Sequence, residues 1–288
     1  MNQRRQGRFP KWGPKSVAVA AVLALIFCAT AAFAAGEAPA PWQLGLHKPA
    51  SLTMERIVTL HDYLLIVITA ICVFVLLLLV WIMIRYNARA NPVPSKNTHN
   101  TTLEVIWTVV PVLILVSIAF PSFRLLYYQD KIPAVDLTIK AIGKQWYWTY
   151  EYPDQGNFTF DALMLTDDKA KAAGDPRLLG ADNHVVVPVG KVVRVLTTGA
   201  DVIHSWSVPA FGVKMDAVPG RINETWFKAE REGIFYGQCS ELCGSRHAFM
   251  PIEVEVVSQE RFTQWVEEAK KKFATLDAPS DTRVAARQ

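Results

Sequence analysis

The sequence predicts a two-helix transmembrane hairpin followed by an all-β sandwich or barrel domain, and three observations carry this prediction. Two uncharged apolar runs, at 63–84 and 105–123, are each long enough for a helix that crosses a bilayer. After residue 130 the chain changes to short β-branched and aromatic runs separated by turn residues, which is typical of strands. A cluster of thiol, imidazole and thioether side chains then lies between the last two of these runs.

Residues 1–35 have the pattern of a secretory signal peptide. Several basic residues precede an apolar run at 17–27, and Ala32-Phe33-Ala34 is a candidate cleavage site. An uncleaved first membrane helix is the alternative, because 17–35 carries no charge. Residues 36–60 begin with a proline- and alanine-rich stretch and predict an extracytoplasmic linker.

The predicted hairpin occupies 61–127, with a connecting loop at 85–104. This loop carries three basic residues before its first acid, namely Arg85, Arg89 and Lys96. By the positive-inside rule the loop is cytoplasmic, so both ends of the mature chain lie outside. The first acid, Glu104, begins the second helix, where a carboxylate is favoured simply by the helix dipole.

The charges divide unevenly between the two halves of the chain. Before residue 130 there are 11 Lys and Arg against 4 Asp and Glu, and from there onward 19 against 22. The soluble part is therefore mildly acidic, which argues against nucleic-acid binding and favours a basic protein partner.

The soluble domain is predicted at 128–257. Its strand-like runs indicate an antiparallel sandwich or barrel, interrupted by a long polar loop at 153–183. Residues 258–288 predict an amphipathic helix and a disordered tail, with the tail at 277–288. One face of this helix carries the apolar residues Phe262, Trp265, Val266, Ala269 and Phe273.

The strongest chemical feature lies at 239–250. Its twelve positions contain two thiols, an imidazole and a thioether, from Cys239, Cys243, His247 and Met250. These are ligands of soft or borderline metals, and of copper above all. A second thiolate has no role at a single copper ion, whereas two sulfurs can each bridge two copper ions. His204 and His247 would then cap one ion each, with Met250 and the backbone carbonyl of Glu241 as weak ligands.

Simpler interpretations exist for each of these residues. Cys239 and Cys243 can form a disulfide in an oxidising compartment. They can also hold structural zinc, although zinc sites usually offer four Cys or His ligands and no thioether. A single blue-copper centre would use only one of the two cysteines. His247 alone fits an ordinary polar histidine, and Met250 alone fits a core residue.

The stretch Gly237–Met250, GQCSELCGSRHAFM, resembles the copper-binding signature of cytochrome c oxidase subunit II. Further stretches are similar to landmarks of the same family, in the same order, at Glu104–Trp107, Gln145–Trp148, Asp201–Trp206 and Asp216–Arg221. The resemblance extends over about residues 42–273 and includes both apolar runs. A signature with this many parts is highly specific.

The resemblance implies a cupredoxin-like β-sandwich and a bacterial respiratory oxidase of the aa3-like type. It implies a dinuclear copper centre held by His204, Cys239, the Glu241 carbonyl, Cys243, His247 and Met250. The Glu241 carboxylate would reach a magnesium or manganese ion shared with subunit I. Haem in subunit I would receive the electrons and reduce oxygen to water, coupled to proton pumping.

The resemblance also implies roles outside the copper ligands. Trp146 matches the residue where electrons from cytochrome c enter, and Asp182 and Asp201 match acids near the docking surface. Glu104 matches the acid at the mouth of a proton channel that continues into subunit I. Ala200 stands where some members carry a second acid, which bears on the docking contacts. The implied setting is the bacterial inner membrane, among lipid and other oxidase subunits, with the copper domain in the periplasm.

Three rival functions are weighed against this interpretation. A quinol oxidase subunit II shares the fold but typically lacks the copper ligands. A membrane-tethered copper carrier or chaperone would need neither Glu104 nor a metal at a subunit boundary. A purely structural sandwich would join Cys239 to Cys243 by a disulfide. No Cys-x-x-Cys-His haem motif is present, so the electron donor is expected to be a separate protein.

Overall fold

The computed structural model describes residues 36–273 of the 288-residue chain. The signal peptide expected at 1–35 and the tail expected at 277–288 lie outside the described residues. The described chain begins with a two-residue strand, β1 (Gly36–Glu37), and an extended segment that leads into the first long helix.

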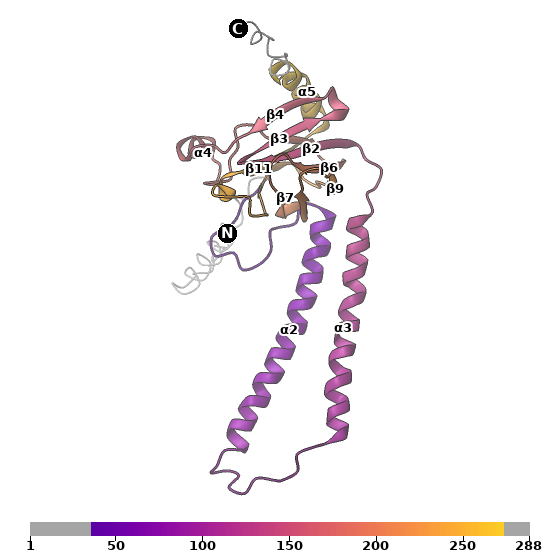
Figure 1. Ribbon diagram of the computed structural model, residues 1–288, viewed down its shortest axis with the longest axis vertical. Coiled ribbons are helices and arrows are strands. Elements are labelled where there is room, and N and C mark those ends of the chain that lie inside the picture. Colours follow the sequence, from indigo (N-terminus) through magenta and orange to yellow (C-terminus); the bar gives the residue numbers. More distant parts are fainter. Residues whose placement is uncertain (1–35, 274–288) are drawn as a thin grey trace, which may run out of the picture. The chain divides into compact units, whose positions relative to one another are not determined.

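Two long helices, α2 (Leu52–Arg85) and α3 (Thr101–Asp130), run side by side (Figure 1). Both are long and apolar enough to cross a membrane. Each begins at a capping side chain: Ser51 Oγ accepts a hydrogen bond from the amide of Met54, and Asn100 Oδ1 from that of Leu103. The helices contain the apolar runs and extend beyond them, because caps rather than hydropathy determine where a helix starts.

The larger sheet has the strand order β4-β3-β2-β6-β9. Its strands are β2 (Leu137–Lys144), β3 (Tyr147–Tyr152), β4 (Phe158–Ala162), β6 (Val192–Gly199) and β9 (Asn223–Lys228). A second sheet pairs β10 with β11 and β11 with β5, and β7 pairs with β8. These strands are β5 (Val185–Pro188), β7 (His204–Val208), β8 (Val213–Ala217), β10 (Gly233–Gln238) and β11 (Pro251–Val257).

The domain differs from a purely antiparallel sandwich in two pairings. Strands β2 and β6 are parallel, and so are β11 and β5. Long crossings join each pair, and a parallel pair requires such a connection. Alternation of apolar and polar residues gives no information about strand direction, so the sequence could not predict these pairings.

The segment at 153–183, expected to be a long loop, contains regular structure. It begins with a short 3-10 helix, η1 (Pro153–Gln155), and continues through β4 and helix α4 (Asp167–Ala173). The prediction missed β4 because only five residues form it, and α4 because only one of its residues, Ala170, is buried.

The aromatic run on β3 fills the core. Trp148, Tyr150 and Tyr152 are each at most 1 % exposed. Helix α5 (Gln259–Phe273) packs over the same region, and four of the five residues of its predicted apolar face are buried, while Trp265 is partly buried. The rings of Phe160 and Phe273, 4.8 Å apart, join β4 to the end of this helix.

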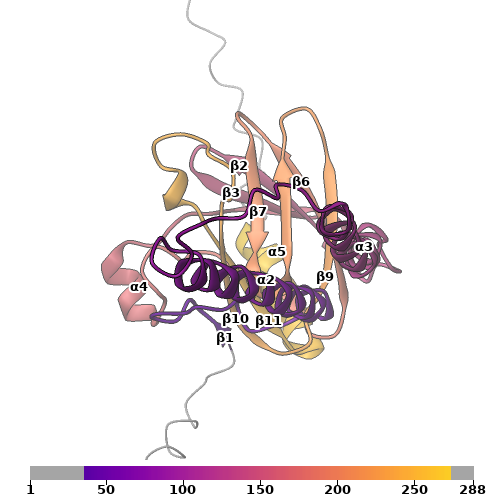
Figure 2. The ribbon, with the colours of Figure 1, turned by 90° about the horizontal axis from the view of Figure 1, so that it is seen from below.

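Both long helices are bonded directly to the β domain. The Ser51 hydroxyl donates to the carbonyl of Phe211 at 2.7 Å, in the 3-10 helix η2 (Pro209–Phe211). The indole of Trp226 on β9 donates to the carbonyl of Gln129 in the last turn of α3 at 3.0 Å. Figure 2 shows α3 beside β9, as these contacts require.

Candidate metal centre

The loop with the predicted metal ligands has both of its ends fixed by one strand pair. Strands β10 and β11 are antiparallel, and their register sets Gln238 opposite Pro251. The twelve residues between them, 239–250, form a closed loop that contains a short 3-10 helix, η3 (His247–Phe249). His204 reaches this loop from the first position of β7, and the amide of Ser240 donates to the carbonyl of Ser205 beside it.

The two thiols of the loop lie side by side without forming a bond. Cys239 Sγ and Cys243 Sγ are 3.9 Å apart, whereas a disulfide has sulfurs about 2.05 Å apart. The ligand atoms of Cys239, Cys243 and His204 all lie within 4.8 Å of one another. The three side chains are buried, so the structure has a compact group of soft and borderline donors shielded from water.

Each thiol has an imidazole and a weaker donor close to it. Cys239 Sγ lies 3.9 Å from His204 Nδ1 and 3.3 Å from the Glu241 carbonyl oxygen. Cys243 Sγ lies 3.6 Å from His247 Nδ1 and 3.6 Å from Met250 Sδ. The six donors predicted from the sequence therefore lie together, arranged as two similar sets around a central pair of sulfurs.

The two thiols have different acidities. Burial works to raise the pKa of Cys239, but hydrogen bonds with His204 and with backbone groups outweigh it and lower the pKa to about 7. Burial and the neighbouring Cys239 raise the pKa of Cys243 to about 12. One thiolate therefore forms easily beside His204, and the charge of that thiolate opposes formation of the second. A metal cation would remove this opposition, because thiolates bind metals in the deprotonated form.

Two glycines make room for the site. A Cβ on Gly143, in β2, would lie 2.7 Å from the ring of His204. A Cβ on Gly237, in β10, would lie 2.0 Å from the Ser207 carbonyl oxygen, so only glycine lets β10 approach β7 this closely. These close approaches bring β7, which carries His204, against β2 on one side and against β10, which leads into the thiol loop, on the other.

Asp201 fixes the orientation of His204, a contact not expected from the sequence. His204 Nε2 lies 2.8 Å from Asp201 Oδ1, on the opposite side of the ring from the Nδ1 atom near Cys239. The carboxylate also accepts hydrogen bonds from the amides of Val202 and Gln145. Burial works to raise the pKa of Asp201, but these bonds, with that from His204 foremost, lower it. The Asp-x-x-His spacing of Asp201 and His204 is the sequence pattern that could have predicted this contact.

Trp146 is connected to the thiol loop by a hydrogen bond. Its Nε1 donates to the backbone carbonyl of Cys243 at 3.2 Å, and the side-chain amide of Gln145 donates to the same oxygen at 2.8 Å. Trp146 also packs against Gly244, whose φ of 120° and close contact with the indole both favour glycine. The indole is only partly buried, so it lies between the solvent and Cys243, a candidate metal ligand.

Other residues singled out in the sequence lie apart from this group. Glu104 is in the first turn of α3, at the far end from the β domain, about 40 Å along the helix from its last residue. Asp182 accepts a hydrogen bond from the amide of Leu163 and stabilises the chain after β4. The side chain of Glu241 is exposed, although its carbonyl faces Cys239.

The fold and the site together define a class of protein: a β domain with a thiolate–imidazole metal site, anchored by a helical hairpin. Comparison with family models is consistent with both parts. The model for the periplasmic domain of cytochrome c oxidase subunit II matches residues 137–257, and that for its transmembrane domain matches residues 39–125.

Individual relatives agree with the family models. A probable cytochrome c oxidase subunit 2 of Rickettsia bellii is 52 % identical over 242 residues, 84 % of this chain and 90 % of the relative. The cytochrome c oxidase subunit 2 of Cereibacter sphaeroides is 47 % identical over 249 residues, 81 % of this chain and 82 % of the relative. The crystal structure of the periplasmic domain of this subunit from Bradyrhizobium japonicum is 64 % identical, covering 50 % of this chain and 99 % of that one, with a TM-score of 0.47.

The chain belongs to the cytochrome c oxidase subunit II family. Its His204–Cys239–Cys243 group suits copper, its two long helices suit membrane anchoring, and its setting is respiratory electron transport as part of an oxidase complex.

Proposed function

We propose that this chain receives electrons from cytochrome c at a dinuclear copper centre and passes them to haem in subunit I, where oxygen is reduced to water. One observation carries the proposal: each of the two adjacent thiols has its own imidazole and its own weak donor. Six donors in two similar sets exceed what one copper ion needs, and they match what two copper ions bridged by two thiolates need.

When bound, the copper pair would supply a site that gains and loses one electron shared between two metals. The residues of this chain restrain the positions of the proposed ligands. His204 is held by Asp201, the loop is closed by the β10–β11 pair, and Cys239, Cys243 and Met250 are at most 5 % exposed. A buried, braced ligand set keeps water out and limits geometric change, which favours fast electron exchange.

Trp146 is the proposed point of electron arrival from cytochrome c. Its partly exposed ring and its hydrogen bond to the Cys243 carbonyl connect the surface with a proposed ligand through one residue. Asp182 and Asp201 are proposed to contribute negative charge to the docking surface, which suits a basic donor protein. The Asp201 carboxylate already accepts two backbone hydrogen bonds and contacts His204, so its role in docking would be secondary to bracing the histidine.

Two further roles belong to the boundary with subunit I. The exposed carboxylate of Glu241 is proposed to bind magnesium or manganese shared with that subunit, since hard cations prefer oxygen ligands. Glu104, at the loop end of α3, is proposed as the mouth of a proton channel that continues into subunit I. For these roles we propose that the hairpin lies in the bacterial inner membrane, with the β domain in the periplasm.

A metal count with an electron paramagnetic resonance spectrum tests the copper proposal. The oxidase complex that contains this chain is purified, and copper is counted after subtracting any in the other subunits. Two copper ions per chain and a seven-line hyperfine pattern are expected, because one unpaired electron would couple equally to two nuclei. One copper ion, or none, at full occupancy would show that the dinuclear assignment is wrong.

A matched pair of cysteine variants sharpens this test. Cys239→Ser is expected to abolish the seven-line pattern and the oxidase activity, because serine cannot supply the bridging sulfur. Cys72→Ser is the control, since Cys72 is an exposed thiol on α2, outside the site. If both variants keep the pattern, Cys239 is not a ligand, and the proposal fails at its central residue.

A further inference from the structure

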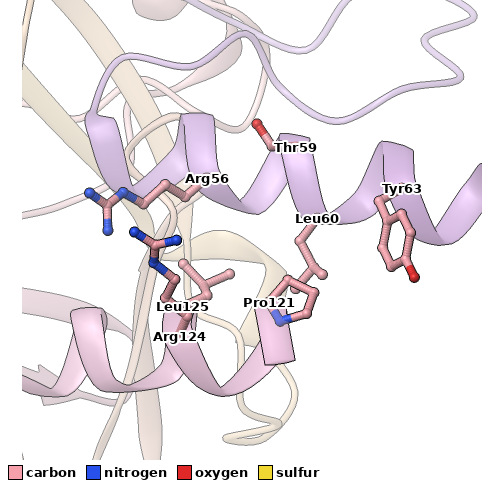
Figure 3. A pocket seen from close by; sticks show the side chains of 7 residues that line it. All are labelled: Arg56, Thr59, Leu60, Tyr63, Pro121, Arg124 and Leu125. Carbon is pink, nitrogen blue, oxygen red and sulfur yellow. The ribbon is translucent and has the colours of Figure 1, made fainter. Parts of the chain in front are cut away.

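A cleft of about 510 Å³ lies between α2 and α3, near the end that meets the β domain. Arg56 and Arg124 line it, one from each helix, and Figure 3 shows their guanidinium groups near one another, with Arg124 extending toward α2 and Arg56 extending along α2. The remaining lining residues carry apolar groups or hydroxyls, and they are Thr59, Leu60, Tyr63, Pro121 and Leu125. The oxidase function proposed above does not use this cleft.

The two arginines lie at the same height along the hairpin. The hydroxyls of Tyr63 and Ser117 are 2.9 Å apart, which fixes the register of the two antiparallel helices. Arg56 and Arg124 are each seven residues beyond that contact in the direction of the β domain, about 10 Å along the helix axes. Two positive charges therefore meet across the cleft, which is unfavourable unless an anion lies between them.

No carboxylate of the described residues 36–273 forms an ion pair with either arginine. Arg56 is instead oriented by an aromatic ring, since its guanidinium carbon lies 3.6 Å from the centroid of Tyr128. A guanidinium stacked on a ring keeps its N–H groups free in the plane, where they suit phosphate oxygens. The arrangement presents one oriented and one exposed arginine to a shared ligand.

The position of the cleft relative to the bilayer narrows the choice of anion. Arg124 directly follows the uncharged run 105–123, and Arg56 precedes the run 63–84 by about two turns of helix. The headgroup layer adds about 5–8 Å on each side of a hydrocarbon core of about 30 Å. Measured from the α3 run the guanidinium groups are at the edge of the hydrocarbon core, and measured from the α2 run they are about 10 Å outside it, so on average they are at the depth of the headgroup layer. Leu60 and Pro121 are closer to the hydrocarbon.

We propose that the Arg56–Arg124 cleft binds the phosphate of an anionic phospholipid from the extracytoplasmic leaflet, with an acyl chain lying along the apolar groove between α2 and α3. A lipid meets both requirements of the cleft, an anion between the arginines and hydrocarbon below them. A free phosphate meets only the first of these requirements.

The test measures lipid retained by the purified oxidase complex. The complex is washed in lipid-free detergent, incorporated into nanodiscs of phosphatidylcholine with increasing phosphatidylglycerol, and its bound lipid is counted by native mass spectrometry. Arg56→Gln combined with Arg124→Gln is expected to lose one tightly bound phosphatidylglycerol, with affinity falling roughly fivefold for each charge removed. Arg56→Lys with Arg124→Lys is expected to retain it more weakly, because lysine keeps the charge but not the planar fork.

Matched controls decide between the possible outcomes. Lys169→Gln with Lys171→Gln removes two charges from α4 and is expected to leave lipid retention unchanged. Equal retention by the wild type and the double glutamine variant, or equal retention of phosphatidylcholine, would overturn the proposal. Displacement of the lipid by inorganic phosphate alone would also overturn it.

A carboxylate of a partner subunit is the competing occupant. Carbodiimide treatment of the Arg56→Lys, Arg124→Lys double variant tests for it. If the reagent joins either introduced lysine to a partner carboxylate, that acid fills the cleft and the lipid proposal fails. Copper content is measured in every sample. It is expected to stay constant, so failure of the lipid proposal is distinguishable from failure of the copper proposal.

Discussion

His204 Nε2 lies 2.8 Å from the Asp201 carboxylate, while the other ring nitrogen of the same histidine faces Cys239. The carboxylate therefore contacts Nε2 of the imidazole, and Nδ1 of the same ring faces the thiol of Cys239. In the proposed copper site this carboxylate–histidine arrangement would fix which ring nitrogen is free for metal and would increase the basicity of that nitrogen. The Asp201 carboxylate also accepts a hydrogen bond from the backbone amide of Gln145, the neighbour of Trp146. One side chain therefore positions both His204 and the proposed electron acceptor.

Replacing Asp201 is expected to weaken copper binding. Asp201→Ala should lower copper affinity by about 10–100-fold, because loss of such an outer contact frees the ligand to rotate. Asp201→Asn should have a smaller effect, since its amide oxygen can still accept one hydrogen bond. Chelator competition on the purified complex measures the affinity. Asp182→Ala, which removes a carboxylate bonded to Leu163 instead, is the control, and equal losses in both variants would contradict a bracing role.

Replacing Trp146 is expected to separate electron transfer from copper binding. Trp146→Phe removes the hydrogen bond to the Cys243 carbonyl, at a cost of about 1 kcal/mol, while Gln145 still serves the same oxygen. Copper content should stay at the wild-type level, but turnover with cytochrome c should fall to a small fraction. Trp265→Phe, on α5, should leave turnover unchanged. Full activity in Trp146→Phe would place the electron path elsewhere.

Adding one methyl group at Gly143 is expected to damage the site. The new Cβ of Gly143→Ala would lie 2.7 Å from the His204 ring, so the ring or strand β2 must move. Overpacking of this kind costs about 1–3 kcal/mol and should also reduce copper occupancy. Thermal unfolding and a copper count measure the two effects. Gly45→Ala is the control, because its Cβ would meet no atom within 4 Å, and similar behaviour of the two variants would refute the packing argument.

The pair formed by Glu253 and His184 predicts a dependence of stability on pH. Glu253 on β11 is 2 % exposed, its Oε1 lies 3.2 Å from His184 Nε2, and its Oε2 accepts from the amide of Ala181. Burial raises the pKa of Glu253 from 4.5 to about 7, against the attraction of His184 and the Ala181 bond. Burial works to lower the pKa of His184, but Glu255 and Glu253 raise it overall, with Asp175 adding to the effect.

Both shifts favour the protonated forms in the folded state. The folded chain therefore binds more protons than the unfolded chain, so its free energy of unfolding declines as pH rises from about 4.5 through about 7. Glu253→Gln should flatten this decline, by on the order of 2 kcal/mol across the interval. Denaturant unfolding of the detergent-solubilised chain at several pH values measures it, with copper present and absent.

Glu255→Gln is the matched control for this prediction. A hydrogen bond from His184 lowers the pKa of Glu255, so its contribution has the opposite sign and is lost as pH falls. The free energy of unfolding of this variant should still decline substantially as pH rises toward neutral, because Glu253 remains. If Glu253→Gln follows the wild-type pH profile, burial of that carboxyl does not govern stability in this range.

The sequence predicted the features that depend on local pattern or on ligand chemistry. The two long helices appear as uncharged runs because lipid excludes charge from 63–84 and 105–123. The candidate ligands within 239–250 are close in sequence, so their grouping needs only a closed loop. His204 was assigned through ligand chemistry and family resemblance, although it is 35 residues away from Cys239.

Features that depend on pairing between distant segments could not be predicted. The parallel pairing of β2 with β6 is set by the path of the chain between them, and no local pattern records it. The contact of Gly143 with His204 depends on two strands that meet only in the folded domain. The cleft between Arg56 and Arg124 likewise requires the register of two helices, which the Tyr63–Ser117 contact fixes.

The direct bonds between the long helices and the β domain limit how the protein can exchange electrons. Ser51 ties the start of α2 to Phe211, and Trp226 ties the last turn of α3 to β9, so neither junction is a free tether. A domain that moves between electron-transfer partners needs a flexible linker at such junctions. These bonds hold the β domain in place on its hairpin, so under the function proposed above the electron donor would have to diffuse to the domain.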